Sequence, residues 1–316
     1  MVSVKTKNTT GVILCLPSYE LRSGIFFYLH KNFTMKNFVL LFLLFGVFSS
    51  AQNQRFLYEY RFILDSTDRD SGKKEMMVLD VSPEGSKFLS IDRMKSDSVM
   101  AARLKTNPGN FDFKGIKFGQ ITTVVEKRYP DFSITFFDQI GMNEYQVNDD
   151  RKMTWKILPE KETIGEFSVQ KATIKLFGRN WTAWFTTEIP IQDGPYKFHG
   201  LPGLILKIAD DKNTHVFEIK SVSKFPGEMK WSFEADKAHV QPLIKVNAAA
   251  YKKLFMVNRE NPSQEIRQIM TSGRKVTMTD ETGKVLDIEK VLRDRDRNQK
   301  AENQKNNNIL ELDLLK

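Results

Sequence analysis

The sequence predicts a mainly β, or β-rich α+β, fold: a curled antiparallel meander sheet with a few helices near the C-terminus. Residues 55–66 alternate in character and place Phe56, Tyr58, Tyr60 and Phe62 on one face of a strand. Many short β-rich runs follow, separated by Gly, Pro, Asn and Asp. Long helices alternating with strands, as in βαβ units, are missing from the pattern, which favours antiparallel pairing.

The remaining elements are expected in a simple order along the chain. Residues 73–81 and 85–94 are expected to pair as a hairpin, because a proline–glutamate–glycine turn signal separates them. Residues 96–105 have the pattern of a short helix. Further strands are predicted in the following ranges: 119–129, 133–140, 144–149, 153–159, 172–190, 203–210 and 215–225.

The composition changes past Gln241. Residues 247–260 and 261–272 have helical spacing, and Pro262 stands where a helix start tolerates it. The end of the chain is charged and rich in asparagine, which is typical of a fraying helix and a mobile tail. The sequence therefore predicts an antiparallel β domain over residues 52–245 and a helical extension with a polar, flexible tail over residues 246–316.

An export signal is predicted over residues 35–51. Lys36 precedes an apolar run from Phe38 to Phe48, and small residues lead to a cleavage site after Ala51. The run is shorter than the roughly 20 apolar residues of a membrane span. The mature chain is thus expected to be exported, in the periplasm or associated with the outer membrane, without a transmembrane span. Residues 1–34 then form an over-extended N-terminus; a long signal with a cytosolic leader is the alternative.

The net charge and the position of the cysteine limit which partners and which catalytic groups the mature chain can have. The formal net charge is +9 for the whole chain, and the part after Ala51 carries 43 Lys/Arg against 38 Asp/Glu. This mild, dispersed excess gives little reason to expect nucleic acid as a partner. The single cysteine, Cys15, precedes the signal, so the mature chain offers no thiol for catalysis or for a zinc–thiolate site.

A proline–glycine pair marks a corner in the middle of the chain. In residues 201–204, Pro202 and Gly203 predict a type II β-turn, because proline fixes φ and glycine tolerates a positive φ. A buried strand is expected to follow directly. The residues assigned to this motif and its two bends are Gly194, Pro195, Gly200, Leu201, Pro202, Gly203, Leu204 and Ile205.

This string carries a family resemblance. Residues 177–210 resemble, in order and spacing, the core of the GLPGLI family of exported Bacteroidetes-type proteins, which is named for the hexamer at 200–205. Residues 155–157 and 170–173 fit the upstream part of the same pattern. Val169 stands where many members carry a cysteine, so no thiol role is transferred. The family has no agreed activity, so the resemblance implies a compartment and no reaction.

No catalytic set emerges from the residues. Neither a G-x-S-x-G nucleophile motif nor a glycine-rich phosphate loop is present. Asp210, Asp211 and His215 are expected as solvated residues near a hairpin turn, and His199 lies at the other end of that strand. A shared metal site would need three or four converging ligands and is therefore disfavoured. No catalytic residue, cofactor or metal ligand is assigned.

Two functions from different classes remain open. The first is a non-enzymatic cell-envelope protein that binds an apolar ligand or a partner protein in a groove of the sheet, as in the half-barrel of periplasmic lipoprotein carriers. The alternative is an exported hydrolase with a site near His199, which needs a carboxylate or hydroxyl about 3 Å from the ring. The plain interpretation of the aromatics is core packing. The candidate groove residues are Trp181, Trp184, Tyr196, Phe198 and His199.

Overall fold

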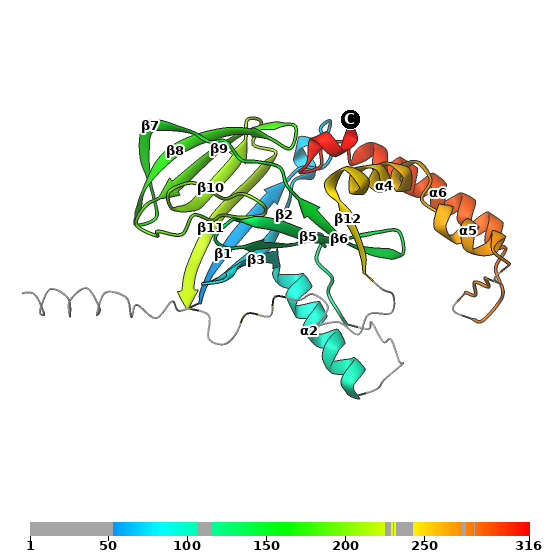
Figure 1. Ribbon diagram of the computed structural model, residues 1–316. Helices are drawn as coiled ribbons and strands as arrows, with labels where there is room; N and C mark the ends of the chain where they lie inside the picture. Colours follow the sequence, from blue (N-terminus) through cyan, green and yellow to red (C-terminus); the bar gives the residue numbers. More distant parts are fainter. Residues whose placement is uncertain are drawn as a thin grey trace, which may run out of the picture. The chain divides into compact units, whose positions relative to one another are not determined.

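One twelve-stranded sheet forms the frame of the protein in a computed structural model (Figure 1). The structure describes residues 53–106, 115–224, 229, 231, 243–273, 276–280 and 282–316, which belong to the unit formed by residues 51–316. The predicted over-extended N-terminus (1–34) and nearly all of the predicted signal (35–51) lie in the first unit, and both fall outside the described residues.

The strands, in chain order, are β1 Gln54–Phe62, β2 Lys73–Ser82, β3 Gly85–Ser90, β4 Val124–Arg128, β5 Ser133–Ile140, β6 Asn143–Asp149, β7 Lys156–Ile164, β8 Phe167–Leu176, β9 Arg179–Thr186, β10 Leu204–Asp210, β11 His215–Lys224 and β12 Ile244–Asn247. Their order in the sheet is β12-β6-β5-β4-β3-β2-β1-β11-β10-β9-β8-β7. The mainly β class is confirmed, and the sheet stays open, with β12 and β7 as its edges.

The antiparallel prediction holds for every neighbouring pair except one. β12 pairs with β6 in parallel, as its register from Ile244↔Tyr145 to Asn247↔Asn148 shows. Hairpin turns fix the direction of most strands, whereas β12 comes from β11 in the middle of the ladder and crosses to the far edge. A strand that arrives by such a crossover is not bound to run antiparallel to its neighbour.

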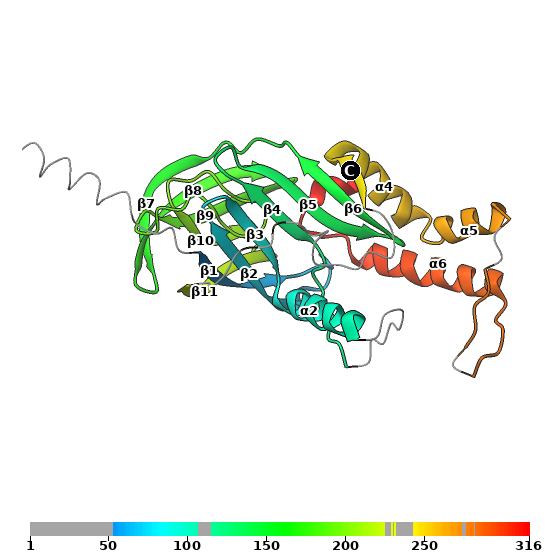
Figure 2. The ribbon, with the colours of Figure 1, turned by 60° about the horizontal axis from the view of Figure 1, so that its bottom comes forward.

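The alternation of β1 sets the inner face of the sheet. Phe56, Tyr58, Tyr60 and Phe62 are all buried, as predicted, and they contribute to one large core cluster shared by strands along the whole ladder. The predicted hairpin is also present, since β2 and β3 pair antiparallel up to Ser82↔Gly85. A core shared by strands far apart in the ladder requires the sheet to curl, which Figures 1 and 2 show.

The helices differ from prediction mainly at their boundaries. α2 spans Ile91–Thr106, so the second strand of the hairpin ends at Ser90 and not at residue 94. The Ser90 hydroxyl accepts a hydrogen bond from the Arg93 amide at 3.3 Å, which is the local reason for the earlier helix start. The first turn of α2 packs, through Ile91 and Met94, against a second, smaller core cluster on β2–β5. The 3₁₀ helix η1, Arg69–Ser71, lies between β1 and β2.

Three helices make up the C-terminal extension: α4 Ala248–Glu260, α5 Gln264–Thr271 and α6 Ile288–Lys305, followed by the 3₁₀ helix η2, Leu312–Leu315. Figure 1 shows this extension leaving one end of the sheet and η2 returning toward the strands. Asn247 caps α4 by accepting a hydrogen bond from the Ala250 amide at 2.9 Å. Tyr251 of α4 reaches the core, where its ring meets Phe136 edge to face at 5.0 Å.

The long connection between β9 and β10, residues 187–203, lies inside the curled sheet. Phe198 is fully buried, and its ring lies 5.0 Å from that of Trp181 on β9. The same loop accepts hydrogen bonds from the Lys127 side chain on β4. Because β4 and β9 are far apart in the ladder, the loop fills the space between two parts of the sheet that face each other.

The corner at the end of this loop is not a type II turn. Gly203 has a positive φ of 152°, as expected, but its amide bonds to the carbonyl of Leu201 at 2.7 Å, closing a tighter turn about Pro202. The next amide, that of Leu204, bonds back to Ile189 at 3.1 Å. The loop's own backbone therefore replaces the hydrogen bond that would define a β-turn here.

Gly203→Ala is expected to destabilise the fold by about 2 kcal/mol or more, because an added Cβ would overlap the carbonyl oxygen of Thr186 in a backbone conformation that side chains rarely adopt. Gly200→Ala is the matched control: φ is +90° there, but nothing lies within 4 Å of the added atom. That variant should lose only about 1–2 kcal/mol. Urea unfolding of the two variants measures the difference, and equal losses would contradict the close approach.

Candidate functional site

A buried ammonium group holds the loop to the sheet. Lys127 is completely buried, and its Nζ pairs with the carboxylate of Asp193. It also donates to the carbonyls of Gly194 at 2.8 Å, Tyr196 at 2.9 Å and Phe198 at 3.4 Å. Burial lowers the pKa of Lys127, and the charge of Asp193 opposes that shift. Four acceptors around one ammonium thus fix the loop in place.

A second buried cation lies one residue beyond Tyr196. Lys197 is 1% exposed and pairs with Asp149 at 3.0 Å and with Glu311 at 2.5 Å. Its Nζ also lies 3.5 Å from the centre of the Phe136 ring. Burial acts to raise the pKa of Glu311, but Lys197 and Arg151 outweigh it and hold that pKa below its usual value. The loop is therefore joined by charge to the C-terminal segment.

The C-terminal segment is anchored, so the predicted flexible tail is wrong for its last residues. Asn308 is buried, its side-chain amide donates to Ile63 at 2.6 Å, and its oxygen accepts from Arg179 at 2.7 Å. Arg179 also bonds the carbonyl of Ile309 at 2.6 Å. The polar composition of the chain's end suggested solvent exposure. Its polar groups instead accept hydrogen bonds from a buried charge of the sheet, the guanidinium of Arg179.

The turn residues Asp210 and His215 are also buried, in place of the solvated position that was expected. Asp210 pairs with Arg179 at 2.9 Å and accepts from the His215 amide at 2.9 Å. The His215 ring bonds Tyr60 at 2.7 Å through Nδ1 and the Asn308 carbonyl at 2.8 Å through Nε2. Burial, together with the charge of Arg179, lowers the pKa of His215 to about 4.

The candidate groove residues do not share one surface. Trp181 and Phe198 are buried against each other, and Tyr196 is 8% exposed with its hydroxyl on Glu311 at 2.6 Å. Trp184 is half-buried on the other face of β9, where Lys171 lies 6.0 Å from the ring centre. The opposite orientation of the two tryptophans was predicted from their spacing. Their environment is that of core packing.

His199 stacks on the ring of Phe132 at a centroid distance of 4.7 Å and an interplanar angle of 1°. Its Nδ1 is buried and has no hydrogen-bond partner among the described residues. Burial, followed by the charge of Lys127, lowers the pKa of His199 to about 4. In the described part of the chain, no carboxylate or hydroxyl is hydrogen-bonded to this ring, as the hydrolase hypothesis required.

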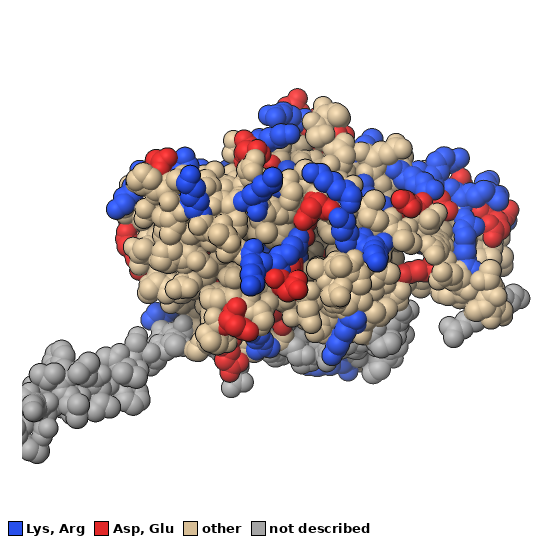
Figure 3. All heavy atoms as spheres, turned by 45° about the horizontal axis from the view of Figure 1, so that its top comes forward, with Lys and Arg blue, Asp and Glu red and all other residues tan. Residues whose placement is uncertain are grey.

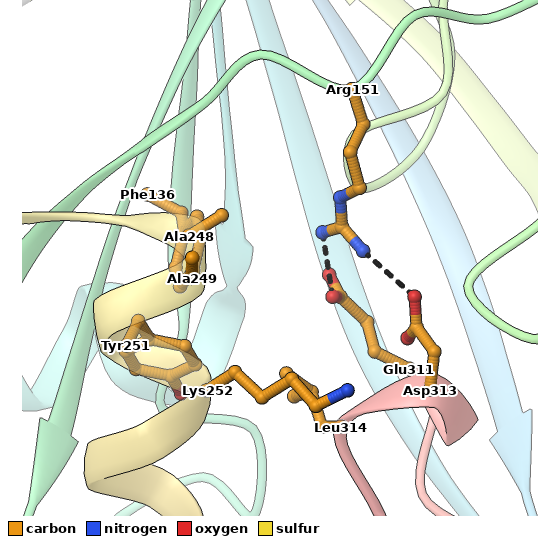
Figure 4. A pocket seen from close by; sticks show the side chains of 9 residues that line it. All are labelled: Phe136, Arg151, Ala248, Ala249, Tyr251, Lys252, Glu311, Asp313 and Leu314. Atoms are coloured by element: carbon orange, nitrogen blue, oxygen red, sulfur yellow. Dashed lines mark hydrogen bonds and ion pairs between the residues drawn. The ribbon is translucent and has the colours of Figure 1, made fainter. Parts of the chain in front are cut away.

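A cavity of about 180 Å³ lies beside the second cation cluster (Figure 4). Its apolar walls come from Phe136 of β5, the first turns of α4 and the end of the chain. Arg151 and Glu311 lie on the opposite side, joined by an ion pair of 2.7 Å. The residues that line it are Phe136, Arg151, Ala248, Ala249, Tyr251, Lys252, Glu311, Asp313 and Leu314.

Two further features concern ions and membranes. Within the described ranges, no group of three or more His, Cys, Asp or Glu side chains is arranged to hold a metal ion. In the same part of the chain, no helix has both the length and the apolar character needed to cross a membrane.

Sequence reasoning missed the buried lysines and the cavity. The alternation of β4 contains a signal for the first, because Val125 and Lys127 have the same parity and Val125 belongs to the main core. A lysine on the inward face of a strand demands a partner. Nothing in the local pattern indicates that the partners lie in a loop about 70 residues further along the chain.

His199→Phe is expected to keep the stacking on Phe132 and to flatten the pH dependence of stability. The folded state leaves His199 neutral down to about pH 4, whereas the unfolded chain takes up a proton below the ordinary value of 6.5. The contribution of the neutral His199 ring to the free energy of unfolding is therefore complete above pH 6.5 and is lost as the pH falls toward 4. Between neutral pH and pH 4, the free energy of unfolding of the variant should therefore fall by up to about 3 kcal/mol less than that of wild type.

The comparison must be made as a difference between wild type and variant, because Glu126 contributes with the opposite sign. Burial raises the pKa of Glu126 to about 7, so the folded state holds that proton more tightly than the unfolded chain. Urea unfolding from pH 7 to 4 measures both proteins under matched conditions. Parallel curves for the two proteins would show that His199 does not titrate differently on folding.

The comparisons with known proteins give one family model and distantly similar solved structures. The model described as "Protein of unknown function (Porph_ging)" matches residues 177–207, and no curated protein matches the sequence. Solved structures with similarity include PNGF-II in a C2 and in a P21 space group, at 17% and 16% identity and a TM-score of 0.44 in both. Each covers 66% of this chain and 34% of PNGF-II, so the chain spans about a third of that protein. The region matched by the family model of unknown function contains the whole loop, residues 187–203, that fills the sheet.

Proposed function

We propose that this chain is an exported, non-enzymatic cell-envelope protein of the GLPGLI family that binds a small molecule with an apolar body. The family assignment is supported by the model match at residues 177–207, which includes the hexamer at 200–205. Export to the periplasm or outer membrane rests on the signal pattern at 35–51. N-terminal sequencing of protein from the envelope fraction tests it, with Gln52 as the expected first residue.

The binding site in this proposal is the cavity between α4 and η2, not a groove on the sheet. Trp181 and Phe198, which were candidates for a groove, are packed in the core around the loop. The cavity beside Tyr251 and Phe136 keeps a volume of about 180 Å³. This cavity, with its largely apolar walls, is the observation that carries the proposal.

The size of the cavity limits the ligand. An apolar cavity of about 150 Å³ can hold one benzene molecule, so 180 Å³ suits a body of about six to nine non-hydrogen atoms. The cavity is partly open to solvent, and Lys252 of α4 lies beside Leu314 of η2 at its border (Figure 4). A small aromatic ring or a short branched chain fits this space, whereas a lipid acyl chain would extend beyond it.

A small ligand fits the surface better than a partner protein bound through strand addition. The free edge strand β7 is almost entirely exposed, and four of its nine residues are charged: Lys156, Glu160, Lys161 and Glu162. It also carries Pro159, which cannot donate to a ladder. Charged side chains and proline on an edge strand oppose pairing with another chain.

Ala249→Leu is expected to weaken binding of benzyl alcohol by at least tenfold, because the larger side chain occupies the mouth of the cavity. Ala301→Leu, the same change at an exposed position of α6, should bind as wild type does. Ligand-observed NMR and titration calorimetry measure both. Equal affinities in the two variants would overturn the site, and the absence of binding to wild type by a panel of small aromatic and branched probes would overturn the function.

A further inference from the structure

We propose that the cavity between α4 and η2 selects a small monocarboxylate, whose carboxylate pairs with Lys252; this inference rests on the binding function proposed above. The ligand would place an apolar ring or branched chain between Phe136 and Tyr251. Its carboxylate would lie beside the Lys252 side chain, which extends from α4 toward Leu314 (Figure 4).

The other cations near the cavity are already paired within the chain. Arg151 contacts Asp149 at 2.5 Å, Glu311 at 2.7 Å and Asp313 at 3.3 Å. Lys197 behind it is satisfied by Asp149 and Glu311. A ligand carboxylate at either cation would have to displace one of these buried pairs, which would leave an uncompensated charge.

Lys252 is in a different situation. It lines the cavity and is half-buried, and within the described residues its ammonium has no hydrogen bond and no carboxylate within ion-pair distance. An ammonium that is partly removed from water beside apolar walls gains from a charge-assisted bond. Charge complementarity at this position therefore favours a carboxylate over a neutral or cationic group.

Two carboxylates of the chain, Glu311 and Asp313, line the cavity and could compete with a ligand carboxylate for Lys252. Both oxygens of Glu311 are engaged, Oε1 by Tyr196 and Lys197 and Oε2 by Arg151. Asp313 uses Oδ2 for Arg151, and its buried Oδ1 accepts no hydrogen bond from any residue that the structure describes. Asp313 is thus the in-chain alternative, and if it dominated the site, a ligand amine would be preferred to a ligand carboxylate.

Long-range attraction does not explain the expected selectivity. On the face drawn in Figure 3, Lys and Arg are interspersed with Asp and Glu, so no large field of one sign surrounds the molecule there. Preference among ligands of equal size must then come from groups at the cavity itself. This makes one lysine substitution a decisive test.

The experiment compares three probes of similar size: phenylacetate, benzyl alcohol and benzylamine, by calorimetry at pH 7. Wild type is expected to bind phenylacetate at least tenfold more tightly than benzyl alcohol, and benzylamine least. Lys252→Met should bring the ratio of the phenylacetate affinity to the benzyl alcohol affinity close to one, and this ratio is the quantity compared between the variants. Lys253→Met, the exposed neighbour on the same helix, is the matched control and should retain the preference.

The outcomes separate this inference from the function on which it rests. Binding of benzyl alcohol that Ala249→Leu blocks, with no preference for phenylacetate, would overturn the carboxylate and leave the binding site standing. Tighter binding of benzylamine would assign the site to Asp313. An unchanged preference in Lys252→Met would overturn the role of Lys252. No binding of any probe to wild type would overturn both proposals.

Discussion

Inside the curled sheet, the ammonium group of Lys127 gathers the backbone carbonyls of a loop from the other half of the ladder. Those carbonyls belong to the buried residues 194, 196 and 198, and a buried carbonyl without a hydrogen bond is costly. Desolvating one ammonium and one carboxylate costs several kcal/mol each, and only good geometry offsets that. Lys127 and Asp193 meet this condition because the ammonium contacts the Asp193 carboxylate and three backbone carbonyls at once.

The rest of the structure follows from this placement. With the loop held by Lys127, Phe198 fills the space against Trp181, and the preceding residue, Lys197, points to the opposite side. There it pairs with Glu311 and draws the C-terminal segment onto the sheet. α4 and η2 then close over the end of the core, and the cavity lined by Lys252 is the space that their side chains leave. A structural motif and a candidate binding site are thus connected by two buried lysines.

The elements that local pattern predicted are those governed by local physics. Alternation located β1 and its aromatic face, turn chemistry located the β2–β3 hairpin, and helical spacing located α4. Positive φ at Gly203 was also foreseeable from its place after proline. The turn type was not, because the hydrogen bonds that decide it come from Ile189, outside the corner itself.

What local pattern could not supply depends on contacts between distant parts of the chain. The pair of Lys197 with Glu311 joins residues 114 positions apart, and Asn308 bonds a carbonyl 245 positions away. A charged, asparagine-rich end is typical of a mobile tail. Here it is ordered because its polar groups pair with the buried cations Arg179 and Lys197. The cavity lined by Phe136, Tyr251 and Leu314 is likewise a product of three segments that no sequence window contains.

Hydrogen exchange of the loop amides in Lys127→Met, compared with Arg128→Met, tests the central claim most directly. Arg128 is the neighbouring residue of β4 and is exposed, so its replacement keeps the strand and removes a cation from the outside. We predict that amides of residues 193–201 lose protection in Lys127→Met while those of β10 and β11 keep most of theirs. Loop amides equally protected in both variants would contradict the claim that the Lys127 ammonium holds the loop in the sheet.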